Sequence, residues 1–249
     1  MFTTLSFFLL LVIIFIIWHY SILRKVTLYT HLFFLESMIH RIGPYISIDS
    51  NIYMLTGSQN ILIDAGTGLS SNEVIRSIRN VLGPEGRLDK ILLTHCHFDH
   101  IGGVPYLVSA FGCKVYVGYA DAIAIRNGDY NYTLSHDFGI DIPPIPVEDL
   151  HEGDIIDNGE SRLRVIETPG HTMGGVSFYD EISSSLFSGD TVFSNGYGRT
   201  DFNAGSLEVL RKSIRKLCNT PVKGLYPGHG LPVSDGSAAI QRALEMVGE

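Results

Sequence analysis

The chain has 249 residues, with 18 Lys and Arg against 26 Asp and Glu, which gives a formal net charge of −8. Hydrophobic residues make up 45% and charged residues 18%, so the composition excludes a disordered chain and predicts a packed core. The acidic balance argues against nucleic acid as a partner, because such binders carry a basic patch or stripe. The cysteines Cys96, Cys113 and Cys218 are too few and too scattered for a disulfide framework, and they fit reduced thiols.

The chain begins with an apolar segment, and residues 5–23 contain no Asp, Glu, Lys or Arg. About 20 apolar residues are needed to cross a bilayer. Trp18 and Tyr20 stand where interfacial anchors occur, and Arg24 and Lys25 follow. The sequence therefore predicts a single-pass membrane anchor through residues 5–23. The positive-inside rule places the rest of the chain in the cytoplasm.

The alternative for residues 1–37 is a misassigned start, because Met38 begins a stretch typical of the start of a soluble domain. Residues 38–249 contain no long linker, repeat or low-complexity run. A length of about 210 residues suits a single domain. We therefore expect an anchor or upstream extension at 1–37 and one domain at 38–249.

Strand-like runs and helical patterns alternate along the predicted domain, although pairs of adjacent strands also occur, which favours α/β layers. Ser70 and Glu73 resemble a capping box for a helix that Gly83 ends, Ser206 is expected to cap a second helix, and Ser237 to begin the last one. The strands are expected at residues 46–55, 60–64, 90–93, 114–117, 162–167, 176–179, 185–187 and 224–226.

Two connections stand out. The Asp157-Asn158-Gly159 turn predicts a hairpin that leads into the strand at 162–167. The segment 119–153 is less regular, and it fits either a lid or pocket wall, or a surface excursion packed by its own aromatic side chains.

Ligand-type side chains gather directly after the expected strand at 90–93, in the run His95-Cys96-His97-Phe98-Asp99-His100. Three further candidates each follow a strand-like run and stand beside glycine, which lets the backbone turn sharply. Five histidines and two aspartates exceed what one tetrahedral zinc takes, so a site for two metals is predicted. The predicted metal ligands are His95, His97, Asp99, His100, His171, Asp190 and His229.

In order and context this motif resembles the metallo-β-lactamase fold superfamily. The resemblance covers about residues 40–236 and implies a four-layer αβ/βα sandwich with the site at one edge. It implies one metal on His95, His97 and His171 and another on Asp99, His100 and His229, with Asp190 bridging them. It also implies that Asp64 supports the metal loops without binding metal. The true β-lactamases differ at several ligands, so antibiotic hydrolysis is not implied.

Two zinc ions at such a site lower the pKa of a bound water, and the resulting hydroxide attacks a carbonyl carbon, so no serine or cysteine nucleophile is needed. Asp99 and Asp190 are the predicted catalytic residues, and Asp99 is expected to orient the hydroxide as well as to bind metal. Cys96 lies between two ligands, and we expect its side chain to turn away from the metal and pack.

The stretch from Ser188 to Phe202 resembles the glyoxalase II-like branch of the superfamily. This implies hydrolysis of a thioester, ester or lactone-type carbonyl of a small molecule. Arg199 and Tyr197 are candidates for substrate contact, with the alternative that Arg199 pairs structurally with Asp201. Full-length glyoxalase II has a C-terminal helical domain that helps to bind glutathione, whereas this chain has room for one helix after His229, which disfavours glutathione thioesters.

Two other functional hypotheses stay open. The Gly198–Phe202 stretch also resembles persulfide dioxygenases, which implies one Fe²⁺ on His95, His171 and Asp190; imidazole binds zinc and iron alike. A membrane-anchored binding protein with a purely structural metal is the third reading, although structural zinc sites are closed and typically rich in cysteine. RNA processing is disfavoured by the acidic charge.

Overall fold

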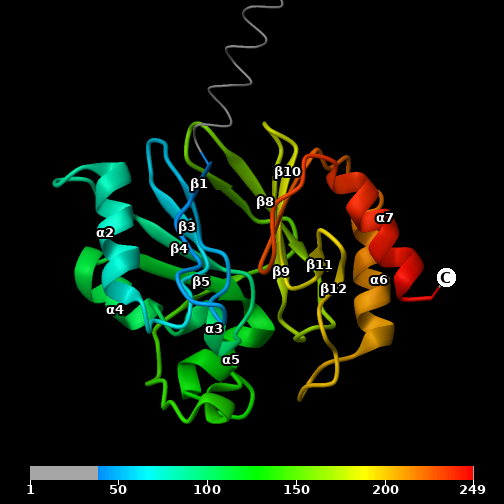
Figure 1. Ribbon diagram of the computed structural model, residues 1–249, viewed down its shortest axis with the longest axis horizontal. Helices are drawn as coiled ribbons and strands as arrows, with labels where there is room; N and C mark the ends of the chain where they lie inside the picture. The colour runs from blue at the N-terminus through cyan, green and yellow to red at the C-terminus, as the bar shows by residue number, and fades with distance from the viewer. Residues whose placement is uncertain (1–38, 249) are drawn as a thin grey trace, which may run out of the picture. The chain divides into compact units, whose positions relative to one another are not determined.

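Two mixed β-sheets form the centre of the chain (Figure 1). The computed structural model describes residues 39–248, so the predicted anchor through residues 5–23 lies outside the described residues. Within 39–248, no helix has the length and apolar character needed to cross a membrane. From His40 onward the chain forms one compact unit.

The first sheet has a buried core of apolar strands. β2 is antiparallel to β3, and β3 through β6 run parallel. The central strands are nearly continuous runs of Ile and Leu, as expected for strands covered on both faces. In sheet order the strands are β1 (Ile39–Arg41), β2 (Tyr53–Leu55), β3 (Ile61–Ile63), β4 (Lys90–Leu93), β5 (Lys114–Gly118) and β6 (Glu148–Leu150). Its helices are α2 (Ser71–Leu82), α3 (Phe98–Ile101), α4 (Val104–Phe111) and α5 (Tyr119–Asn127).

The second sheet is antiparallel except at one edge, where β10 and β13 run parallel. In sheet order the strands are β13 (Gly224–Pro227), β10 (Ser185–Gly189), β9 (Val176–Asp180), β8 (Arg162–Glu167) and β7 (Ile155–Asp157). The small ribbon of β11 (Val192–Phe193) and β12 (Gly196–Tyr197) follows β10, and α6 (Leu207–Leu217) and α7 (Gly236–Met246) complete this half.

The two sheets face each other, with helices on their outer faces. In Figure 1, α2 and α4 cover one side and α6 and α7 the other. Tyr53 of β2 joins the sheets: its ring lies 5.6 Å from the ring of Phe187 and 5.5 Å from that of Tyr226, and its hydroxyl donates to the carbonyl oxygen of Pro227. The predicted α/β layering is confirmed.

The predicted strand at residues 46–55 is wrong over its first part. Only Tyr53–Leu55 forms a strand. The side chain of Asp49 accepts hydrogen bonds from the backbone N–H groups of Tyr45, Ile46 and Thr67, and the Asp49 N–H donates to the Ile46 carbonyl. An aspartate that binds nearby backbone groups in this way competes with a strand ladder.

The three predicted helices begin within one residue of their predicted positions, but at two of them the capping contact is not the expected one. The side chain of Ser206 accepts from the Val209 N–H and caps α6 as predicted. Ser70 makes no capping hydrogen bond, because its backbone is not extended as a cap requires. Asp235, not Ser237, caps α7, and the Ser237 hydroxyl bonds to the backbone of Val222.

The irregular segment 119–153 contains more structure than its sequence indicates, namely α5, a 3₁₀ helix η1 (Ser135–Phe138) and β6. The predicted hairpin at 157–159 is confirmed, since β7 and β8 pair across it. Gly159 has a φ of +87°, a conformation that favours glycine.

Asp121, in the first turn of α5, joins the two halves of the fold. Its buried carboxylate accepts from the N–H of Cys96, which follows β4, at 3.0 Å. It also accepts from the Thr172 hydroxyl at 2.7 Å and from the Gly174 N–H at 2.8 Å, both between β8 and β9. One carboxylate therefore fixes the loops that follow β4 and β8 relative to each other.

We expect Asp121→Asn to lower the free energy of unfolding by about 1–3 kcal/mol. The substitution replaces one carboxylate oxygen by an NH₂ group, so at least one of the three groups that donate to Asp121 loses its acceptor. Urea unfolding followed by circular dichroism measures this. The exposed Asp141 provides a matched control, and Asp141→Asn should change the value by less than about 0.5 kcal/mol. Equal stability of the two variants would contradict the bridging role of Asp121.

Candidate metal centre

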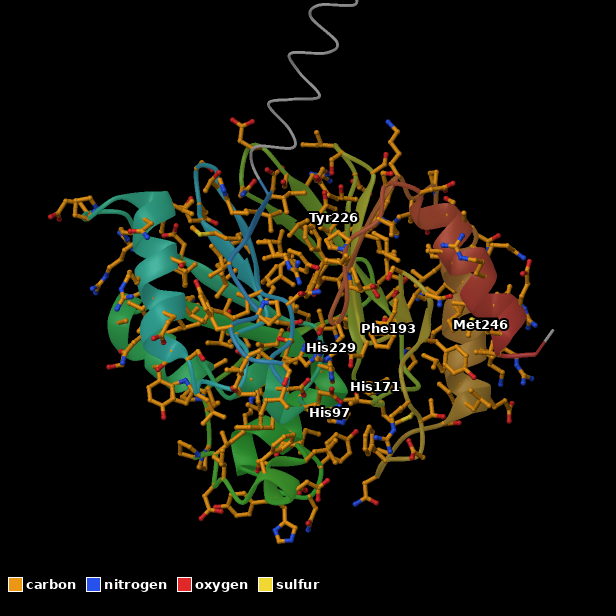
Figure 2. All side chains as sticks on the ribbon, viewed as in Figure 1. His97, His171, Phe193, Tyr226, His229 and Met246 are labelled. Atoms are coloured by element: carbon orange, nitrogen blue, oxygen red, sulfur yellow. The ribbon has the colours of Figure 1, made fainter. Side chains whose placement is uncertain are left out.

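All seven predicted ligands lie shortly after strands, five of them in loops and Asp99 and His100 in the short helix α3, and they meet between the two sheets. His95, His97, Asp99 and His100 follow β4 of the first sheet. His171 follows β8, Asp190 follows β10 and His229 follows β13, all in the second sheet. In Figure 2 the labelled His97, His171 and His229 lie close together between the halves. Strand ends of two sheets thus supply one site.

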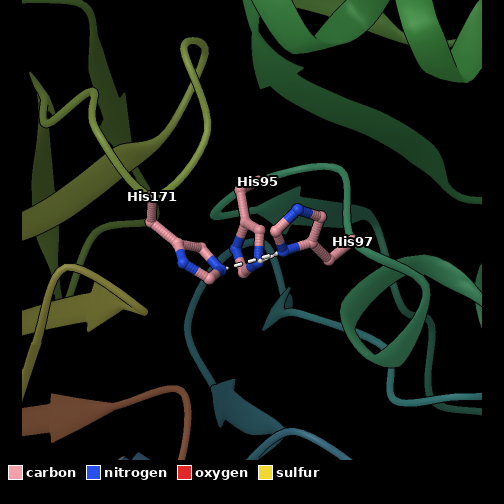
Figure 3. Close-up of side chains that lie close together, drawn as sticks. All are labelled: His95, His97 and His171. Carbon is pink, nitrogen blue, oxygen red and sulfur yellow. Dashed lines mark hydrogen bonds between the residues drawn. The ribbon is translucent and has the colours of Figure 1, made fainter. Parts of the chain in front are cut away.

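The first group of side chains is His95, His97 and His171 (Figure 3). Nδ1 of His97 lies 3.1 Å from Nε2 of His95 and 2.9 Å from Nε2 of His171. All three side chains are buried. The arrangement points three imidazole nitrogens at one position.

The second group is Asp99, His100 and His229. Oδ2 of Asp99 lies 2.9 Å from Nε2 of His229 and 3.5 Å from Nε2 of His100. His229 and Asp99 are the more exposed members, with side chains 35% and 20% accessible, so the site opens to solvent on this side.

The carboxylate of Asp190 lies between the two groups. Its Oδ1 is 3.4 Å from Nε2 of His100, and its Oδ2 is 3.6 Å from Nε2 of both His171 and His229. Oδ2 therefore faces both groups and Oδ1 faces the second, so the carboxylate occupies the position of a bridging ligand.

The donor set fits metal binding. Two nitrogens that ligate one tetrahedral zinc at 2.0–2.1 Å lie about 3.3 Å apart, close to the separations in the first group. Nδ1 of His97 approaches two other imidazole nitrogens but can carry only one proton. Among the described residues, the buried Nε2 of His100 and Oδ1 of Asp190 have no hydrogen-bond partner, so a cation suits both.

The outer nitrogens of His95, His100 and His171 are held by the protein. Nδ1 of His100 lies 2.7 Å from Oδ2 of Asp64, and the other Asp64 oxygen accepts from the Thr94 N–H. The Thr94 hydroxyl lies 3.1 Å from Nδ1 of His95. Nδ1 of His171 donates to the Arg199 carbonyl oxygen at 2.6 Å. Such contacts orient the rings and leave the inner nitrogens for a ligand. Asp64 lies as expected of a supporting residue.

Burial and neighbouring charges shift the pKa values of the histidines in opposite directions in the two groups. Burial, then the neighbouring imidazoles, lowers the pKa of His95 well below its usual value and that of His97 to about 3. Both are thus neutral at neutral pH, the form that ligates metals. Burial also disfavours charge on His100, but nearby carboxylates outweigh it and raise its pKa well above the usual range.

The pKa values of the two carboxyl groups, Asp99 and Asp190, are lowered. Burial alone raises the pKa of a carboxyl group, but His100 and then His229 outweigh it and lower the pKa of Asp99. The pKa of Asp190 is likewise held far below normal, chiefly by His100 against the effect of burial. Both carboxylates are therefore ionised, as a metal ligand must be.

Two glycines allow the chain to approach Asp190. A Cβ atom at Gly228 would lie 2.1 Å from Oδ1 of Asp190, and one at Gly198 would lie 1.8 Å from the Asp190 carbonyl oxygen. No side chain fits at either position. This explains why glycine stands directly before His229 and Arg199 in the sequence.

A pocket of about 480 Å³ opens onto the centre. Of the predicted substrate residues, Arg199 lines it, but its guanidinium pairs with Asp201 through two hydrogen bonds. Tyr197 is not among the lining residues, and it packs against the core under α6 and α7. Leu134 and Phe138 of the segment 119–153 line the pocket, which confirms the pocket-wall alternative for this part of the segment, whereas the apolar walls Ile48, Phe193 and Phe202 were not predicted from the sequence.

Cys96 turns away from the centre, as predicted. Its side chain is buried in the core of the first sheet, and Sγ lies 4.0 Å from the Tyr132 carbonyl oxygen. Burial raises the pKa of this thiol well above the usual value. Asp121 is the positioning residue that the sequence analysis missed, and its place just after a strand-ending glycine was the available signal.

Two relatives resemble this chain over most of its length. A protein named "Probable metallo-hydrolase" from Methanocaldococcus jannaschii is 36% identical over 202 residues, which is 78% of this chain and 93% of that protein. A hydroxyacylglutathione hydrolase from Cereibacter sphaeroides is 36% identical over 181 residues, which is 71% of this chain and 63% of that protein. The chain therefore spans less than two thirds of the second relative.

Two solved structures share the fold. The B3 metallo-beta-lactamase BLEG-1 superposes with a TM-score of 0.70 at 30% identity, covering 80% of this chain and 95% of that one. A protein crystallised in a di-iron-bound form superposes with a TM-score of 0.67 at 32% identity, covering 81% and 96%.

A family model also matches the chain. The model described as "Metallo-beta-lactamase superfamily" matches residues 48–229, a range that contains every predicted ligand. Since this is well over half of the chain, the chain belongs to the metallo-beta-lactamase superfamily.

Proposed function

We propose that this chain is a dinuclear zinc hydrolase that cleaves a thioester, ester or lactone-type carbonyl of a small molecule. The observation that carries the proposal is the position of the Asp190 carboxylate, whose Oδ2 lies at equal distance from His171 of the first group and His229 of the second, while its Oδ1 faces His100. The hydroxyacylglutathione hydrolase relative supports hydrolysis of a thioester.

The residues have separate roles. His95, His97 and His171 would hold one metal, and Asp99, His100 and His229 the other, with Asp190 shared. Bound divalent metals lower the pKa of a coordinated water and polarise a carbonyl oxygen. Asp99 lies on the open side of the centre, where its carboxylate can accept the proton of an attacking water and orient it. Asp64 and Thr94 hold His100 and His95 in place.

A second candidate is iron chemistry at the same residues. Imidazole and carboxylate ligands bind iron as well as zinc, and the di-iron-bound relative supports this choice of metal. In a mononuclear iron persulfide dioxygenase the ligands would be His95, His171 and Asp190. His97 lies outside that set, so its removal separates the two candidates.

Elemental analysis of the purified full chain should find about two zinc ions per chain. His97→Ala should reduce this to about one, because the first metal loses a ligand. His151, which stacks on Tyr119 away from the centre, is the control, and His151→Ala should retain both ions. About one iron per chain in the unaltered protein would favour the dioxygenase.

Asp64→Asn should weaken zinc affinity by about 10- to 100-fold, because the amide NH₂ opposes the Nδ1–H of His100 and frees that ring to turn. Competition with a chromophoric chelator measures the affinity. Asp180 is an equally buried aspartate at the far end of β9, so Asp180→Asn should change stability but leave zinc affinity unchanged. Equal zinc affinities in both variants would refute a positioning role for Asp64.

The zinc-loaded chain should release thiol from simple thioesters. A chelator should stop the release, added zinc should restore it, and His97→Ala should abolish it, since the proposed reaction requires both metals. Thiol release followed with a disulfide dye measures the reaction. Oxygen consumption with a persulfide, retained in His97→Ala, would overturn hydrolysis in favour of the iron enzyme.

A further inference from the structure

We propose that the substrate is an uncharged ester or thioester with an apolar acyl group, and not a glutathione conjugate or another anionic thioester. This inference rests on the proposed hydrolase function and names its substrate class. It is carried by the walls of the pocket, the pairing of Arg199 and the charge of the adjoining surface.

The walls of the pocket beside the metal centre are apolar. Ile48 and Phe138 stand at its mouth with 40% and 43% of their surface exposed. Phe193 lies next to His229, with ring centroids 6.2 Å apart, and Figure 2 shows the two side by side. Phe202 stands edge-on to His97, with ring centroids 5.6 Å apart. A carbonyl group bound at the centre therefore has apolar surface on both sides.

Arg199 is the one Lys or Arg side chain that lines this pocket within the described chain, and it is already paired. Its Nε donates to Oδ1 of Asp201 at 2.9 Å and its Nη2 donates to Oδ2 at 2.7 Å. The guanidinium also lies 4.3 Å from the centre of the Phe202 ring. The planar fork that would bind a substrate carboxylate is occupied, and Arg199 supports an apolar wall instead.

The adjoining surface repels anions. A second hollow of about 250 Å³ shares Leu134, Asp137 and Phe202 with the pocket, so it continues the path away from the centre. No Lys or Arg lines it within the described residues, whereas Asp137 does, and Asp201 at its edge already accepts both hydrogen bonds of the Arg199 fork. Like charges placed together are unfavourable, so a leaving group with carboxylates or phosphates is disfavoured here.

The test compares uncharged thioesters of N-acetylcysteamine on the full, zinc-loaded chain. From acetyl to butanoyl to hexanoyl, kcat/KM should rise by up to about fourfold per methylene. The succinyl thioester, which matches butanoyl in chain length but carries a carboxylate, should fall at least about tenfold below it. S-lactoylglutathione should also be poorer than butanoyl. A flat series, or a preference for either anionic substrate, would overturn the inference.

Three variants test whether this substrate preference arises in the pocket. Ile48→Ser should reduce the hexanoyl-to-acetyl ratio of kcat/KM severalfold, because it removes apolar wall at the mouth. Ile182 has similar exposure, 49%, at the turn between β9 and β10 far from the centre, so Ile182→Ser should leave the ratio unchanged. Asp201→Asn should raise the succinyl-to-butanoyl ratio severalfold by freeing Arg199. Equal ratios in all variants would refute the assignment of these residues.

A binding measurement separates this inference from the proposed function. If the zinc-loaded chain cleaves no thioester, the hydrolase proposal fails, but the pocket can still be tested with the neutral fluorescent probe N-phenyl-1-naphthylamine. The probe should bind, hexanoate should displace it better than succinate, and Ile48→Ser but not Ile182→Ser should weaken its binding. No binding, or equal displacement by both acids, would overturn the inference independently of turnover.

Discussion

Burial of imidazole and carboxylate side chains at the junction of two sheets is the constraint on which the rest of the structure depends. His95, His97, His100 and His171 are almost inaccessible to solvent. Buried polar groups are costly unless each finds a partner. Asp64 and Thr94 supply partners for the outer ring nitrogens of His100 and His95, whereas the inward Nε2 of His100 and Oδ1 of Asp190 keep none, as expected where a cation binds. The strands, turns and glycines of the core are arranged to permit these contacts.

The need for partners explains why supporting residues outnumber the ligands. Asp64 holds one ring and one backbone N–H, and Asp121 holds the loop between His95 and His97 against the loop after His171. Even the Arg199 carbonyl oxygen fixes a ligand, through Nδ1 of His171. The stretch from Ser188 to Phe202, which contains the candidate substrate residue Arg199, therefore also positions a metal ligand.

The sequence predicted the site best where ligand-type side chains directly follow the end of a strand. A short apolar strand followed by His95 and His97, and glycine beside each later ligand, predicted residues that the structure brings together. It was least informative where tertiary contacts decide local structure. Asp49 breaks a predicted strand because its partners include Thr67, which is distant in sequence. The walls Ile48 and Phe202 were not predicted for the same reason, since they become neighbours of the centre only through folding.

The division of the ligands between two sheets has a consequence for motion. His95 and His97 come from one sheet and His171 from the other, yet their nitrogens lie about 3 Å apart. A hinge movement between the sheets would pull these atoms apart, so the two halves of the fold must stay together for the first group of side chains to hold a metal. The turn at Ile48 and the 3₁₀ helix that ends at Phe138 carry none of these ligands, so the rim of the pocket can change in sequence without displacing the side chains at its floor.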